Sequence, residues 1–100
     1  LCGYLQVDYK RLAAAVGVSR DKLMRLEPDA VQSDLGYELG GVAPFAPNAQ
    51  TEVLIDSGAL GWQVIFCGTG RNDRTLEIDP HLLVRVAGAR VAGLAKIYCE

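Results

Sequence analysis

The chain has 100 residues, of which half are hydrophobic, and its 10 basic and 12 acidic side chains give a formal net charge of −2. This length corresponds to one small domain, residues 1–100, and the hydrophobic content is sufficient for a compact core. The charge balance excludes a protein that grips nucleic acid along an extended phosphate track, so an RNA partner would need a local basic patch. No apolar run is long enough to span a bilayer, and we expect no membrane partner.

The three cysteines, Cys2, Cys67 and Cys99, form no closely spaced pair. An odd, scattered set argues against both a disulfide framework and a zinc site. Reduced thiols are typical of a cytoplasmic protein, which is the location we expect. The sequence therefore predicts no metal site, and no motif in it indicates a bound cofactor.

The first third of the chain is basic, and it is predicted to form a helix followed by a short strand. Asp8 suits the N-cap of a helix over Tyr9–Val16, and Gly17 suits the left-handed position that ends it. Lys22–Leu26 alternates polar and apolar residues, which predicts a short strand. The basic residues of this part are either a solvated face or contacts for phosphates; they are Lys10, Arg11, Arg20, Lys22 and Arg25.

A second helix and a buried strand are predicted on either side of a loop in the middle of the chain. Pro28 fits the first position of a helix that runs to about Leu35 and stops at Gly36. Thr51–Asp56 is predicted to be a buried strand, followed by a turn that Asp56 or Ser57 can cap. Trp62 is expected to pack at the core or its rim rather than to stack on a base.

Two strands joined by a glycine-rich turn are predicted next. Gln63–Cys67 is the most strand-like run in the chain, and Arg74–Ile78 is the returning strand. The turn between them, Gly68–Asp73, is not a phosphate-binding loop, because no Gly-Lys-Ser/Thr follows it. It is expected to form a hairpin and to wall a pocket.

The last part of the chain is predicted to hold a third helix and a closing strand. Asp79 suits its N-cap, Pro80 its first position and Gly88 its end. Arg90–Ala95 is expected to close the sheet. His81 is the single histidine of the sequence and lies in the first, exposed turn of this helix, where nothing places it near a nucleophile.

The central stretch, Gly36–Pro47, is the most unusual part of the sequence. Gly40 and Gly41 give a main-chain segment without Cβ atoms, and Pro44 then stiffens it. Such a loop can present N–H groups to a carbonyl or an oxyanion. The alternative is an ordinary turn rich in glycine and proline.

An ordered set of segments resembles the YbaK family, the relatives of the editing domain of bacterial-type prolyl-tRNA synthetases. Tyr37–Phe45 resembles the central loop of that family, and Val7–Gly17 is similar to its first recognisable helix. Phe66–Arg71 with Arg74–Ile78 is similar to its late glycine turn and strand. Leu82-Leu83 with Gly88–Ala92 resembles its C-terminal helix and strand. The resemblance covers nearly the whole chain, in the right order.

The alternation of short helices and short strands predicts a mixed α/β domain around a curved sheet. The resemblance implies a small, barrel-like mixed sheet flanked by short helices. Leu1–Leu5 reads like the end of a strand already under way, and we expect the N-terminal portion of the family's domain to be missing.

The resemblance implies a trans-editing aminoacyl-tRNA deacylase, which hydrolyses the ester of a mischarged tRNA carrying a small amino acid such as cysteine or alanine on tRNA for proline. Main-chain N–H groups of Gly40 and Gly41 would stabilise the carbonyl oxygen. The substrate-binding residues would be Val42, Ala43, Pro44, Phe45, Gly68, Gly70 and Thr75. The partners would be the acceptor end of tRNA with its amino acid and an aminoacyl-tRNA synthetase, with the chain a monomer or weak homodimer.

Two alternatives remain open on the sequence. Members of the family carry a lysine on a strand before the matched region, and no residue here corresponds to it, since Lys10 lies inside the helix pattern. The chain can therefore be a catalytically inactive module of the same fold that binds an aminoacyl end, a nucleotide or a synthetase. It can also be a fragment whose open sheet edge pairs with another chain.

Overall fold

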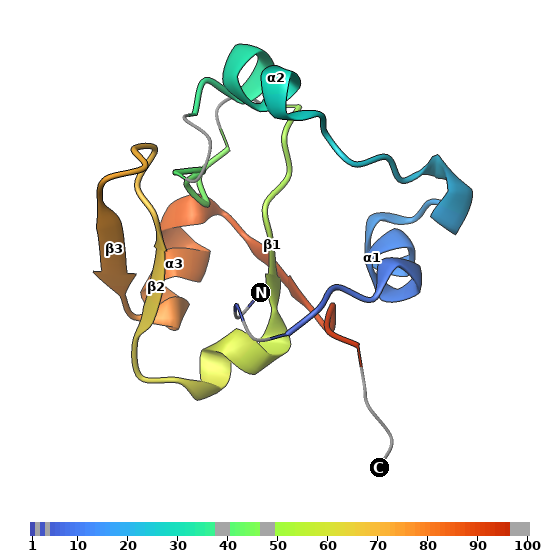
Figure 1. Cartoon of the computed structure of the whole chain (residues 1–100). Coiled ribbons are helices and arrows are strands. Elements are labelled where there is room, and N and C mark those ends of the chain that lie inside the picture. Colours follow the sequence, from blue (N-terminus) through green and yellow to red (C-terminus); the bar gives the residue numbers. More distant parts are fainter. Residues whose placement is uncertain (2, 4, 38–40, 47–49, 97–100) are drawn as a thin grey trace.

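Short helices and strands alternate along the chain, which confirms the mixed α/β class (Figure 1). The computed structural model describes residues 1, 3, 5–37, 41–46 and 50–96. In chain order its elements are α1 (Tyr9–Val16), η1 (Arg20–Lys22), α2 (Pro28–Ala30), η2 (Val31–Leu35), β1 (Leu54–Asp56), η3 (Ser57–Gly61), β2 (Ile65–Gly68), β3 (Thr75–Ile78), α3 (Pro80–Ala87) and β4 (Arg90–Ala92). No helix in these residues is long and apolar enough to cross a bilayer.

Local capping interactions begin and end α1 as the sequence predicts. The Asp8 carboxylate accepts hydrogen bonds from the N–H groups of Lys10 and Arg11, at 3.0 and 3.3 Å. These bonds satisfy donors that have no partner within the helix. Gly17 ends the helix with a φ of 76°, a left-handed conformation that costs glycine little.

The same arrangement confirms the predicted bounds of α3. The Asp79 carboxylate accepts a hydrogen bond from the N–H of His81 at 2.8 Å, Pro80 occupies the first turn, and Gly88 ends the helix. The bond from His81 N–H holds the pKa of the Asp79 carboxyl below its ordinary value.

The described strands form two ladders. β1 pairs in parallel with β4, with Ile55 opposite Val91, and β2 pairs antiparallel with β3, with Phe66 opposite Glu77. The β2–β3 pair confirms the predicted hairpin. An isolated antiparallel bridge joins Val7 to Ala95 and ties the segment before α1 to the segment after β4.

The core lies between β1, η3 and α3, and its centre is Ile55, Ala59 and Leu83. Figure 1 shows the β2–β3 hairpin and α3 on one side of β1 and α1 on the other. Partly buried hydrophobic residues pack around that centre; they are Phe45, Ile65, Ile78, Val84, Ala87 and Ala89.

Asp56 joins three segments at the end of β1. Its side chain is 3% exposed, and among the described residues it is the buried charged group. One carboxylate oxygen accepts a hydrogen bond from the N–H of Leu94 at 2.9 Å, and the other accepts from the N–H of Gly58 at 3.3 Å. Asp56 therefore caps η3, as the sequence allows, and also holds the segment after β4.

Two predicted strands are wrong within the described residues. Residues 20–22 form the short helical turn η1, and residues 23–26 pair with no strand. The alternation over Lys22–Leu26 buries little, since Met24 is 91% exposed and Leu26 is 43% exposed. Of the segment Leu1–Leu5, the described residues 1, 3 and 5 lie outside any strand.

The other predicted elements are present with shifted ends. The second helix runs from Pro28 to Leu35, as α2 followed by the wider turn η2, and Gly36 adopts a φ of 75°. β1, β2 and β4 are shorter than the apolar runs that predicted them, because pairing stops where no neighbouring strand continues.

Replacing Asp56 with alanine is expected to destabilise the fold by about 2–4 kcal/mol, because the buried Leu94 N–H loses its acceptor and η3 loses its cap. Urea denaturation followed by circular dichroism measures the change. Asp73→Ala, which removes an exposed ion pair with Arg71, is the control and should cost under about 1 kcal/mol. Equal losses in both variants would contradict the role given to Asp56.

Candidate active site

The central loop and the hairpin turn pack main chain against main chain at two glycines. A Cβ on Gly41 would overlap the carbonyl group of Arg71 and lie 2.6 Å from the nitrogen of Asn72. A Cβ on Gly68 would overlap the carbonyl oxygen of Val42. The N–H of Gly70 donates to the carbonyl oxygen of Gly41 at 2.7 Å. Both glycines are therefore required by the approach of another backbone.

Tyr37 fixes the other end of this loop. Its hydroxyl donates a hydrogen bond to the carbonyl oxygen of Phe45 at 2.7 Å. Its ring also lies against Gly70, where a Cβ would sit 3.4 Å from the ring carbons. The sequence analysis assigned Tyr37 no role of its own. The feature that could have indicated one is an aromatic hydroxyl three residues before the Gly40-Gly41 pair.

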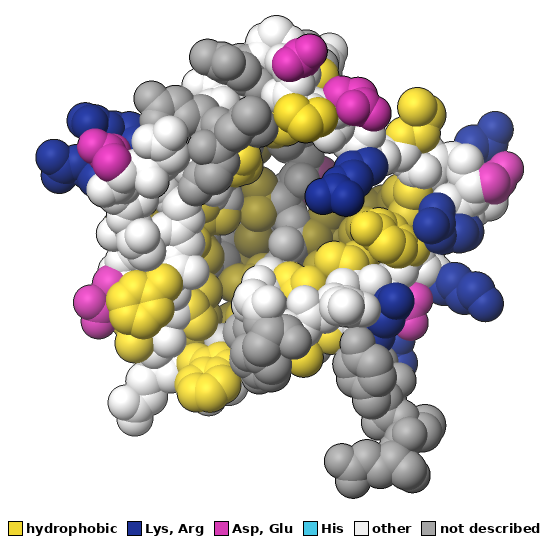
Figure 2. Space-filling model, viewed as in Figure 1, with side chains coloured by type: hydrophobic (Ala, Val, Ile, Leu, Met, Phe, Trp, Pro, Cys, Tyr) yellow, Lys and Arg dark blue, Asp and Glu magenta, His cyan; other side chains and the backbone are white. Residues whose placement is uncertain are grey.

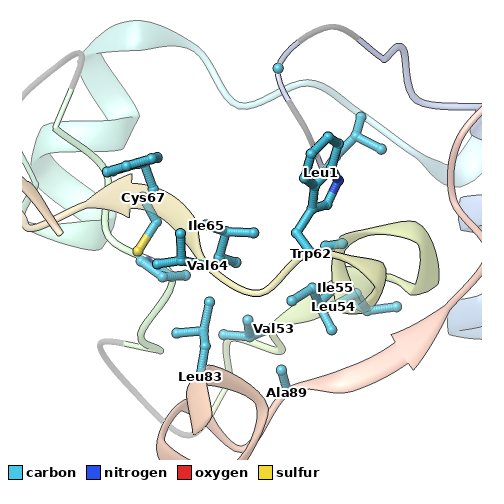
Figure 3. A pocket seen from close by; sticks show the side chains of 14 residues that line it. Leu1, Val53, Leu54, Ile55, Trp62, Val64, Ile65, Cys67, Leu83 and Ala89 are labelled. Atoms are coloured by element: carbon cyan, nitrogen blue, oxygen red, sulfur yellow. The ribbon is translucent and has the colours of Figure 1, made fainter. Parts of the chain in front are cut away.

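A hollow lined mostly by apolar side chains opens beside this loop. It has a volume of about 470 Å³. Figure 2 shows it as a depression with hydrophobic walls, and Figure 3 shows Val53, Val64 and Leu83 pointing toward one another around it, with Leu1 and Trp62 together at one side. The lining residues are Leu1, Gly3, Pro44, Val53, Leu54, Ile55, Ala59, Trp62, Val64, Ile65, Phe66, Cys67, Leu83 and Ala89.

The central loop contributes to the hollow and to its support. Pro44 lines the hollow, while Phe45 packs against the core. Ala43 is buried, and Val42 is 45% exposed. Gly40 lies outside the described residues.

The hairpin holds the remaining predicted site residues. Gly68 lies against the main chain of Val42, and Gly70 lies against the ring of Tyr37. Neither glycine is among the residues that line the hollow. Thr75 is exposed on β3, directly opposite Gly68. The structure therefore brings the two glycine-containing segments together. The hairpin turn supports the central loop, and its glycines do not form the second wall of the hollow that the sequence predicted.

Two main-chain N–H groups of the loop have no acceptor among the residues that the structure describes. Within the described part of the chain, no acceptor takes a hydrogen bond from the N–H groups of Val42 or Ala43. Ala43 is only 7% exposed, and buried N–H groups are almost always paired. This loop can therefore receive an oxygen atom from a bound molecule.

The hollow offers little side-chain chemistry. Of its lining residues, only Trp62 and Cys67 carry a polar side-chain atom, a donor N–H and a thiol. Burial raises the pKa of the Cys67 thiol. His81 is exposed and paired with Asp79, and no group of three or more potential metal ligands occurs in the described ranges. Trp62 is 53% exposed and lines the hollow, and it is not among the residues that pack against the core, where it was expected.

Comparison with known proteins gives a consistent result. Residues 3–86 match the model of a family described as the aminoacyl-tRNA editing domain. The uncharacterized protein YwhH of Bacillus subtilis is 28% identical over 89 residues, which is 89% of this chain and 55% of that protein.

Solved structures with the same fold are also longer than this chain. The crystal structure of a candidate trans-editing enzyme for prolyl tRNA synthetase matches with a TM-score of 0.83 and 26% identity, over 97% of this chain and 60% of that one. The crystal structure of hypothetical protein APE2540 matches with a TM-score of 0.84 and 25% identity, over 96% and 62%. This chain thus spans a little over half the length of these relatives, and its fold is the one they share.

Adding a methyl group at Gly41 or Gly68 should destabilise the protein by about 1–3 kcal/mol, because the neighbour that must move is backbone. Urea unfolding of Gly41→Ala and Gly68→Ala measures the effect. Gly61→Ala is the matched control, since a Cβ there meets nothing within 4 Å, and it should change the stability by less than about 1 kcal/mol. A Gly41→Ala protein as stable as the parent would contradict the close approach.

The raised pKa of the Cys67 thiol predicts that this thiol is alkylated more slowly in the folded protein than in the unfolded chain. With Cys2 and Cys99 replaced by serine, the iodoacetamide reaction of the folded protein should reach half its maximal rate at a higher pH than in urea. Because the folded state favours the neutral thiol, its contribution to stability is present below the unfolded pKa and is lost as the pH rises through the folded pKa. Cys67→Ser should lack that loss, and identical profiles in folded and unfolded protein would refute the prediction.

Proposed function

Because the chain belongs to the family of aminoacyl-tRNA editing domains, we propose that it hydrolyses the ester between an amino acid and the terminal ribose of a mischarged tRNA. The observation that carries this proposal is the segment of residues 41–46, in which the N–H groups of Val42 and Ala43 have no acceptor among the described residues and directly precede Pro44 at the wall of the hollow. An ester carbonyl placed there would find donors for its oxygen and an apolar space for its side chain.

The reaction needs few protein groups. The oxygen of a water molecule attacks the carbonyl carbon, and the carbonyl oxygen gains the negative charge. The bond to the ribose oxygen then breaks, and that oxygen takes the proton that the attacking water gives up, leaving a free amino acid and an intact tRNA end. Fixed N–H donors stabilise the charged oxygen by about 3–4 kcal/mol for each donor. We assign this role to the main chain of Gly40, Gly41, Val42 and Ala43.

The hollow bears on substrate size. A volume of about 470 Å³ lies within the range of small-molecule sites and exceeds a cysteine or alanine side chain. It can hold the side chain of the aminoacyl group and leaves space for part of the terminal nucleoside. In this proposal Pro44 borders the side chain, Phe45 supports Pro44 from the core, and the exposed Thr75 meets the part of the substrate outside the hollow.

A small amino acid on tRNA for proline is the substrate we propose. The support is the similarity to a solved structure described as a candidate trans-editing enzyme for prolyl tRNA synthetase. The synthetase is then the source of the mischarged tRNA and the natural partner. We propose that the protein works in the cytoplasm.

The test is release of amino acid from alanyl-, cysteinyl-, leucyl- and prolyl-tRNA for proline. We expect the chain to release alanine or cysteine faster than the uncatalysed ester, and Gly41→Val to lose about 100-fold or more, as when an oxyanion donor is displaced. Gly61→Ala should keep the parent rate. Pro44→Ala, which leaves the main-chain donors in place, should change the ratio of leucine to alanine release and so guards against a folding defect in the valine variant. No release above background by the parent would overturn the proposal.

A catalytically inactive binding module is the second candidate. It is favoured by the lack of any carboxylate, amine or imidazole on the side chains of the described residues that line the hollow. Binding of an amide-linked aminoacyl-adenosine, with no turnover of the corresponding ester, would favour this function over hydrolysis.

A further inference from the structure

Positive charge is concentrated in one short part of a chain that is negative overall. Residues 9–26 contain five cations and one anion, a net charge of +4, whereas the whole chain carries −2. The remaining residues therefore carry −6. We call this cluster the basic face; it consists of Lys10, Arg11, Arg20, Lys22 and Arg25.

The basic face is exposed and only partly neutralised. All five residues are exposed. Arg11 lies 3.7 Å from the Asp8 carboxylate, and the Arg20 guanidinium lies 4.7 Å above the Tyr9 ring. In the described part of the chain, the other three cations make no ion pair. Figure 2 shows Lys and Arg side chains gathered over α1 and the segment after it, on the face where the hollow opens.

The position of two of these cations is unfavourable for the helix itself. Lys10 and Arg11 occupy the first turn of α1, where the helix dipole favours negative charge, and that turn contains no acidic residue. Met24, which lies between Lys22 and Arg25 in the sequence, is 91% exposed, so this segment combines positive charge with an apolar side chain. Among the described residues, the Asp8 carboxylate offsets only part of this charge, whereas the phosphates of an external polyanion would meet the whole cluster.

We propose that the basic face binds the phosphate backbone of the acceptor stem of the tRNA whose aminoacyl end enters the hollow. The inference rests on the proposed function, which supplies the RNA. The longest dimension of the molecule is 37 Å, about one turn of a nucleic-acid duplex, roughly 34 Å. The contact is therefore confined to the stem next to the reacting end. Because phosphates carry no base identity, this contact positions the stem without reading its sequence.

The test compares Lys22→Gln/Arg25→Gln with Arg85→Gln, which removes an exposed cation from α3, outside the basic face. Binding of tRNA that carries no amino acid is measured by fluorescence anisotropy between 50 and 200 mM salt. We expect the double variant to bind about 20-fold more weakly, with a salt slope smaller by about 2, and Arg85→Gln to bind like the parent. Equal weakening by Arg85→Gln, or no weakening by the double variant, would overturn the inference.

Two ester substrates separate this inference from the proposed function. The double variant should hydrolyse alanyl-adenosine at the parent rate and alanyl-tRNA for proline with a KM raised about 20-fold. Unchanged KM for the tRNA substrate would refute the basic face and leave the hydrolase intact. If the parent hydrolyses neither ester, the proposed function fails, while the salt dependence of tRNA binding still decides for or against the basic face.

Discussion

The close contact between two stretches of main chain is the constraint on which the candidate site depends. Gly41 lies against the backbone of residues 71–72, and Gly68 lies against the carbonyl of Val42. No side chain fits between them, so the loop cannot move relative to the hairpin without separating both. The bond from Gly70 N–H to the Gly41 carbonyl then fixes their register. Donors held this way need no reorganisation when charge develops on a substrate oxygen.

The hollow and the core share residues, which links stability to function. Ile55, Ala59 and Leu83 form the centre of the core and also line the hollow. All three are buried, and they are shared by the packed core and the wall of the hollow. Asp56, next to Ile55, anchors this wall through its bonds to Leu94 and Gly58. A substitution that reshapes the hollow from this side therefore also weakens the fold.

Features set by local interactions were predicted well from the sequence. The caps at Asp8 and Asp79 depend on a side chain and an N–H two residues away, so their residue types identify them. The strand expected over Lys22–Leu26 failed because a strand requires a partner, and alternation alone cannot supply one. The fold class came from the order of the elements and from the resemblance, which the family match confirms.

Features set by distant contacts could not be predicted in the same way. Tyr37 acts through a carbonyl eight residues away and through a turn more than thirty residues away. The glycines were recognisable as special, but the sequence does not say that Gly41 meets Arg71 and Gly68 meets Val42. The hollow is assembled from β1, β2, α3 and the loop, so its volume and the lack of charged side chains among its described lining residues appear only in the folded chain.

In the proposed complex, the basic face and the hollow divide recognition and chemistry between different surfaces. The hollow contains no carboxylate among its described lining residues, so the α-ammonium group of an aminoacyl ester would lose hydration there without gaining a partner. In the proposed complex this group stays at the mouth, in water, and the uncharged side chain enters. Affinity for the tRNA must then come from outside the hollow, because a neutral cavity cannot attract a polyanion. The net charge of +4 over residues 9–26 is the part of this chain that can supply it.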